Sequence, residues 1–151
     1  MAKKFKFKLD GLLKVRRFKE EQLKVELGAI NQEIQQVKNR ISQLNKEIED
    51  SYTEQEKIFE SDTSGQLAKF FPYYIDAKRE DIKANENLLY SLSKRYEKKL
   101  KEVGEAMGET KLLNKMRDKE KDSWKKSNEK KEFSEIEEVL SMRKAYKDGE
   151  L

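Results

Sequence analysis

The sequence has no cysteine and no histidine, and its 151 residues include one proline and six glycines. Without cysteine and histidine the chain cannot form disulfides, bind zinc or haem through thiolate or imidazole, or use either side chain as a catalytic nucleophile. A globular domain with many turns needs more glycine and proline than this. The composition excludes much of enzymology and leaves either a charged helical chain or a disordered one.

Long apolar runs are also missing. The longest aromatic-rich run, at residues 70–75, has six members, whereas a helix that spans a bilayer needs about 20 apolar residues. The basic N-terminus is followed by no continuous apolar stretch of the kind found in secretion signals. We therefore expect a cytoplasmic protein with no cofactor and with no catalytic, cofactor-binding or metal-binding residues.

Charged residues make up 42% of the chain, and apolar residues 35%. In the first third, apolar residues recur at alternating spacings of four and three, which is the a/d seam of a left-handed coiled coil. The seam residues are Leu23, Leu27, Ile30, Ile34, Val37, Ile41, Leu44 and Ile48. Lys, Glu, Gln and Asn between them are good helix formers. The pattern predicts one helix over about residues 9–59.

A second seam follows a break in this pattern. Residues 61–65 are turn-forming, and Pro72 fits the first turn of a new helix, where its missing N–H costs nothing. The second set of seam residues comprises Ile75, Ile82, Leu89, Leu92, Tyr96 and Val103. We predict a loop over about residues 60–66 and a second helix over about residues 67–146.

Two long amphipathic helices joined by a short loop predict an all-α fold. We expect a long antiparallel two-helix coiled-coil hairpin that forms a single domain over residues 1–151. The loop length favours the register in which Ile41 faces Leu92 and Val37 faces Tyr96. Registers displaced by one heptad in either direction keep the same seam in phase.

Positive charge is concentrated in two segments. Residues 1–25 contain nine basic and three acidic residues, and residues 108–131 contain nine basic and five acidic ones. An antiparallel hairpin places these segments side by side at its open end, where both termini lie. Residues 26–91 contain eight basic and thirteen acidic residues. The open end therefore favours an acidic partner.

Two further segments allow more than one interpretation. Trp124 lies among basic residues at 111–131, but acidic residues are interspersed there, as in an ordinary water-facing helix. The four aromatic residues between positions 70 and 74 cannot all face one seam. They either pack at the hairpin tip or form an exposed docking patch.

The N-terminal residues form a motif. They read Phe5-Lys-Phe7-Lys-Leu9-Asp10-Gly-Leu12-Leu13-Lys-Val15-Arg16. This pattern resembles the opening of the FliJ family of flagellar export proteins. The aromatic-rich residues 70–75 and the acidic and apolar residues 132–144 are also similar to segments of that family.

The resemblance implies a cytoplasmic, non-enzymatic component of the bacterial flagellar type III export apparatus, held peripherally at the inner membrane and needed for motility and chemotaxis. It implies that the open end binds the export ATPase hexamer as a stalk and promotes its assembly and activity. It further implies contacts with the export-gate protein FlhA and with export chaperones. No small-molecule substrate or nucleic acid is expected, and the free protein is expected to be a monomer.

The resemblance also assigns roles to residues. The ATPase-contacting residues would be Phe5, Phe7, Leu9, Leu12, Leu13, Arg16, Trp124 and Phe133. The export-gate contacts would be Ile41, Ile48, Tyr52 and Tyr74. We add the hypothesis that the positive open end enters an acidic ring, with apolar contacts at Phe5, Phe7 and Leu9.

Two alternatives stay open at this point. The chain could be a free-standing coiled coil that binds nucleic acid through its basic end. It could also be a structural dimer in which exposed seam flanks, such as Leu100 and Met107, pair two hairpins.

Overall fold

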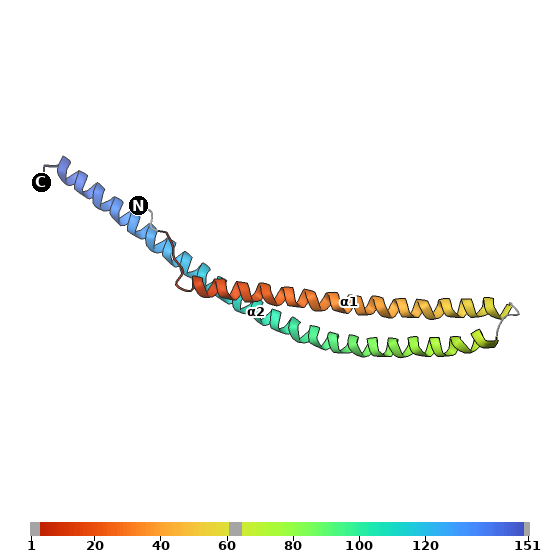
Figure 1. The fold of residues 1–151 in the computed structure, drawn as a ribbon. Coiled ribbons are helices and arrows are strands. Elements are labelled where there is room, and N and C mark those ends of the chain that lie inside the picture. The colour runs from red at the N-terminus through yellow and green to blue at the C-terminus, as the bar shows by residue number, and fades with distance from the viewer. Residues whose placement is uncertain (1–3, 61–64, 150–151) are drawn as a thin grey trace. The chain divides into compact units, whose positions relative to one another are not determined.

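The computed structural model describes residues 4–60 and 65–149, except for the side chains of residues 66 and 67. Within these ranges the chain forms two helices, α1 (Asp10–Glu60) and α2 (Gly65–Lys147), and no strand (Figure 1). The prediction of an all-α helical hairpin is confirmed. The expected loop falls largely on residues 61–64, which lie outside the described residues.

Helix α1 begins directly after the N-terminal motif's aromatic residues. The N–H of Asp10 donates to the carbonyl of Phe7 at 3.2 Å, and the N–H of Leu13 donates to the carbonyl of Leu9 at 2.9 Å. Asp10 lies in the first turn and Lys57 in the last turn, where each charge opposes the helix dipole. Local interactions therefore define both ends of α1.

Helix α2 begins earlier than the position of its proline suggests. Pro72 lies inside α2, and the prediction that it occupies the first turn is wrong. Proline has no N–H, so the carbonyl of Ala68 has no helical donor from this position. Pro72 itself is exposed, and water can satisfy the freed backbone group.

The contacts of the chain divide it into two units. The loop-end unit comprises Glu21–Gly104, and the terminal unit comprises Met1–Glu20 together with Glu105–Leu151. Each unit contains part of α1 and part of α2, and each has an apolar cluster of its own.

The loop-end unit is held together by the heptad seam. One cluster joins Leu92 of α2 to three buried residues of α1, which are Ile30, Ile34 and Val37. Ile41, Leu89 and Tyr96 pack against this cluster. All fourteen seam positions named from the sequence have buried or half-buried side chains. Apolar burial along a narrow seam is thus the main stabilising interaction between the two helices.

The register of the helices differs from the predicted one by a heptad. In the predicted register Lys99 faces Ile34, but in the structure its Nζ lies 2.9 Å from Oε2 of Glu26. The ion pair between Lys78 and Glu47, at 2.7 Å, fits the same displacement, because the predicted register sets Lys78 against Gln55. The connection between Glu60 and Gly65 is centred on almost the same point as the expected loop over residues 60–66, and a hairpin folded at that point has the observed register. The predicted pairing lay one heptad away from the register that this turn sets.

Neither helix carries, among the residues described, an apolar stretch sufficient to cross a membrane. Over the same residues, no group of three or more His, Cys, Asp or Glu side chains is arranged to hold a metal ion.

Candidate protein-binding surfaces

The terminal unit is built around the N-terminal motif. Phe7 and Leu13 are buried together with Leu113 of α2, and Phe5 packs against this cluster. The ring of Phe5 also contacts Trp124, with 6.0 Å between the ring centroids and a tilt of 50°. The residues that precede α1 therefore lie along α2 and anchor the start of the chain there.

Two arginines of α1 add polar contacts to the same packing. Nη1 of Arg16 lies 2.8 Å from Oε2 of Glu109, and Nη2 of Arg17 donates to Oδ1 of Asn114 at 2.8 Å. Such partly exposed pairs contribute little to stability one by one. They do fix which part of α2 lies beside the start of α1.

The proposed ATPase-contacting residues consequently fall into two classes. Five of the side chains are buried in the terminal unit or make contacts within it, namely those of Phe5, Phe7, Leu13, Arg16 and Trp124. Leu13 is 0% exposed, so its apolar surface is used inside the protein. The side chains that remain exposed are those of Leu9, Leu12 and Phe133.

A surface that the motif alone did not reveal lies on the outer side of α1. Leu12, Val15 and Phe18 follow one another at intervals of three residues and are all exposed, Phe18 by 66%. Side chains three apart on a helix lie next to each other. We call these three residues the N-terminal apolar face. The sequence could have indicated this surface through Phe18, because Phe18 lies opposite the seam, where a coiled coil normally carries a polar residue.

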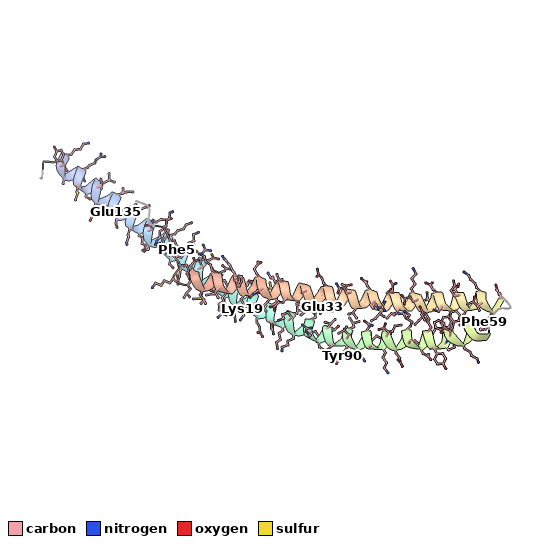
Figure 2. The ribbon with its side chains drawn as sticks, in the orientation of Figure 1. Phe5, Lys19, Glu33, Phe59, Tyr90 and Glu135 are labelled. Atoms are coloured by element: carbon pink, nitrogen blue, oxygen red, sulfur yellow. The ribbon has the colours of Figure 1, made fainter. Side chains whose placement is uncertain are left out.

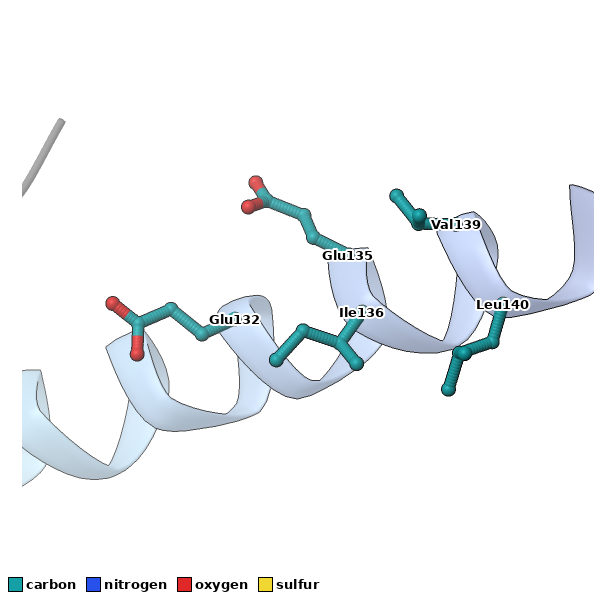
Figure 3. A pocket seen from close by; sticks show the side chains of 5 residues that line it. All are labelled: Glu132, Glu135, Ile136, Val139 and Leu140. Carbon is teal, nitrogen blue, oxygen red and sulfur yellow. The ribbon is translucent and has the colours of Figure 1, made fainter. Parts of the chain in front are cut away.

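The last turns of α2 form a second exposed surface. Every side chain from Glu129 to Lys144 is exposed. The C-terminal apolar face consists of Phe133, Ile136, Val139, Leu140, Met142 and Tyr146. Glu132, Glu135, Ile136, Val139 and Leu140 line a shallow groove of about 420 Å³, with both glutamates at its N-terminal side (Figure 3).

The residues expected to contact the export gate do not form one surface. Ile48 is buried and Ile41 is half-buried in the seam. Tyr52 is exposed, and its hydroxyl accepts a hydrogen bond of 2.8 Å from Nη2 of Arg79. The ring of Tyr74 lies 5.9 Å from that of Phe70, and Nζ of Lys78 lies 5.1 Å above it. Tyr52 alone among the four is freely accessible.

Three other aromatic residues near the loop are exposed instead. Phe59 near the end of α1 (Figure 2), Phe70 and Tyr73 make up the loop-end aromatic surface, with Tyr73 exposed by 79%. A groove of about 310 Å³ lies beside them and is lined by Glu47, Asp50, Ser51, Glu54, Phe70, Phe71 and Tyr74. Both interpretations left open by the sequence therefore hold for part of the aromatic run: some of its rings pack against the helices and others face water.

The seam also contains charged residues with altered pKa values. Nζ of Lys78 lies 2.7 Å from Oε2 of Glu47, an oxygen that is shielded from water. The hydrogen bond from Lys78 lowers the pKa of Glu47 below its ordinary value, and the same bond raises the pKa of Lys78. Hydrogen bonds that Lys99 donates to Glu26 and Glu102 raise the pKa of Lys99. Each shift favours the charged form of its group, which is the form that makes the ion pairs of Lys78 with Glu47 and of Lys99 with Glu26 between the helices.

The sequence of the chain matches a known protein family. A family model described as flagellar FliJ protein matches residues 5–149. The chain belongs to the FliJ family. No curated protein and no solved structure matches it. As a FliJ-family member it is a component of the flagellar export apparatus, and the family is non-enzymatic. The FliJ match covers the N-terminal motif, both units and all three exposed apolar surfaces.

Proposed function

We propose that this chain is the stalk of the flagellar export ATPase. In this role it binds the ATPase hexamer through the terminal unit and promotes assembly and activity of the ring. The observation that carries the proposal is the N-terminal apolar face. It lies on the part of α1 that the buried cluster of Phe7, Leu13 and Leu113 packs against α2. An exposed apolar patch next to a packed core is typical of a protein interface.

Charge supports the same surface. Lys4, Lys6, Lys8 and Lys19 are exposed in the terminal unit, close in sequence to the N-terminal apolar face. Residues 108–131, in the same unit, add nine basic residues against five acidic ones. An acidic ring would attract this unit and speed its association. Since exposed charges are screened over about 10 Å at 0.1 M salt, binding should weaken as salt rises.

The test compares matched surface variants for binding to the cognate export ATPase. Val15→Ser combined with Phe18→Ser should weaken binding by at least tenfold, because each side chain is exposed in the free protein and would be buried in the complex. Tyr73→Ser, in the other unit, should leave binding unchanged. Unaltered affinity of the double variant would contradict the proposal. These variants are preferable to a truncation of residues 1–16, which would also remove the buried Leu13.

Charge reversal tests the electrostatic part separately. Replacing Lys4, Lys6 and Lys19 with Glu should reduce the association rate and flatten its dependence on salt. Arg16 and Arg17 are left intact, because their partners on α2 are part of the fold. If these charge reversals leave the association rate at 0.1 M salt unchanged, electrostatic steering by the terminal unit is ruled out.

We further propose that the loop-end unit links the ATPase to the export-gate protein FlhA and to export chaperones. The work would take place in the cytoplasm, at the inner-membrane base of the flagellum. Support comes from the loop-end aromatic surface and from the accessible ring of Tyr52 in the same unit. Phe59→Ser with Tyr73→Ser should then weaken binding to the cytoplasmic part of the gate, while the Val15 and Phe18 variants should not.

A further inference from the structure

The C-terminal apolar face lies on a helical segment whose charges are sorted along its length. Residues 132–138 contain four glutamates and no basic residue. Residues 139–147 contain three basic residues, Arg143, Lys144 and Lys147, and no acidic one. Exposed apolar side chains run through both halves. The segment is therefore acidic at one end and basic at the other, with exposed apolar side chains in both halves.

We infer that two copies of the chain pair through this segment in antiparallel orientation. Antiparallel pairing sets the acidic half of each copy against the basic half of the other. Parallel pairing would place like charges together, which is unfavourable. The segment is thus complementary to itself in charge, as a two-fold interface requires.

The apolar residues fit the same arrangement. An antiparallel pair with its two-fold axis between Ile136 and Leu140 brings the groove of each copy onto Ile136, Val139 and Leu140 of the other. Near the ends, Glu132 of one copy approaches the basic residues around Lys144 of the other. In this arrangement Phe133 of one copy lies beside the aliphatic stem of Arg143 of the other copy, and that stem can cover the phenylalanine ring. The pairing therefore buries exposed apolar side chains and also places opposite charges next to each other.

The interface is small, and this limits its strength. The helical segment from residue 129 to residue 147 is roughly 28 Å long at 1.5 Å per residue. One helix face of that length buries less surface than a standard protein interface. We expect a reversible dimer with a dissociation constant on the order of 10–100 µM, so the protein is a monomer when dilute.

Self-pairing has a consequence for partner binding. Phe133 belongs both to this face and to the residues proposed to contact the ATPase. Two copies that pair here cover Phe133, so an ATPase that binds the same segment must compete with the dimer. The pairing would then protect the face from nonspecific association until a partner replaces the second copy.

Sedimentation velocity of the full chain from about 1 to 300 µM tests the pairing. The wild type should shift from monomer to dimer across this range, and 0.5 M salt should weaken the dimer. Ile136→Ser with Leu140→Ser should raise the dissociation constant at least tenfold. Val15→Ser with Phe18→Ser is the matched control, equally exposed but on α1, and should not. A monomer at all concentrations, or a dimer that only the control pair weakens, would overturn the inference.

The orientation can be tested directly because the chain has no cysteine. Glu132→Cys and Arg143→Cys are prepared as separate single variants. With a short bismaleimide, a mixture of the two should cross-link several-fold more than either variant alone. Efficient cross-linking of each variant to itself, with no gain on mixing, would show parallel pairing and contradict the proposal.

Discussion

At the scale of single residues, the charged positions within the seam decide how the helices fit. Lys78 and Lys99 occupy positions where a coiled coil normally has an apolar side chain, yet each aims its ammonium group at a glutamate of α1. Long side chains can bury their stems and keep their charge at the edge. A polar residue at a seam position often selects one register over others.

Glu47 makes the stability of the hairpin depend on pH. Its folded pKa lies below the ordinary value of 4.5, because Lys78 and Gln43 hydrogen-bond to the carboxylate. A carboxyl group with a lowered folded pKa stabilises the fold above its unfolded pKa, and this contribution disappears as pH falls through the folded pKa. We expect urea unfolding midpoints to drop below about pH 4.5 and Glu47→Gln to make that drop smaller. An identical acid profile for wild type and variant would contradict this role.

The glycines inside the helices are a second residue-scale case. A Cβ added at Gly28, Gly104 or Gly108 would meet no atom within 4 Å. Close approach of the backbones therefore does not require these glycines, and their flexibility only costs helix stability. Each change to Ala should stabilise by up to about 1 kcal/mol, measured by urea unfolding. Gly149→Ala is the contrasting control: with a φ of 74° after the end of α2, it should give no gain.

At the scale of elements, the sequence predicts the helices and their inner faces well. The run from Leu23 to Ile48 repeats so regularly that only a helix with one buried side accounts for it. The heptad repeat also limits the prediction, because sliding one helix by seven residues gives the same pattern. The turn and the polar seam residues choose among the registers, and the pairing predicted from the sequence was displaced by one heptad from the register that the turn sets.

The register can be checked by cross-linking within one chain. Cysteines introduced at Glu26 and Lys99 lie in the observed register, since the native side chains form an ion pair of 2.9 Å. Cysteines at Glu33 and Lys99 lie one heptad away and would suit the predicted register. With a short cross-linker, the first pair should react at least tenfold faster. Faster reaction of the second pair would show that the helices adopt the other register.

The candidate site was harder to predict than the helices. The N-terminal motif drew attention to this end of the chain, but composition and spacing could not tell which motif residues are buried. Phe7 and Leu13 pack inside the terminal unit because the residues before α1 lie along α2. Val15 and Phe18 are left on the outside. Burial here depends on contacts between distant segments, which a local pattern does not encode.

At the scale of the whole molecule, exposed apolar surface and charge are distributed by segment. The N-terminal apolar face lies among basic residues, the loop-end aromatic surface lies beside a groove that three acidic residues help to line, and the C-terminal apolar face carries both signs. Three separate exposed surfaces are consistent with the proposal that the chain connects several proteins. Membership of the FliJ family makes this chain a component of the flagellar export apparatus.

ATP hydrolysis by the cognate export ATPase is the most direct measure of the proposed stalk function. Wild-type chain should stimulate hydrolysis and promote ring assembly. Val15→Ser with Phe18→Ser should abolish most of this stimulation at concentrations where the wild type saturates it, while Phe59→Ser with Tyr73→Ser should leave it intact. Full stimulation by the Val15 and Phe18 double variant, with its helicity unchanged by circular dichroism, would show that the N-terminal apolar face is not the surface that engages the ATPase.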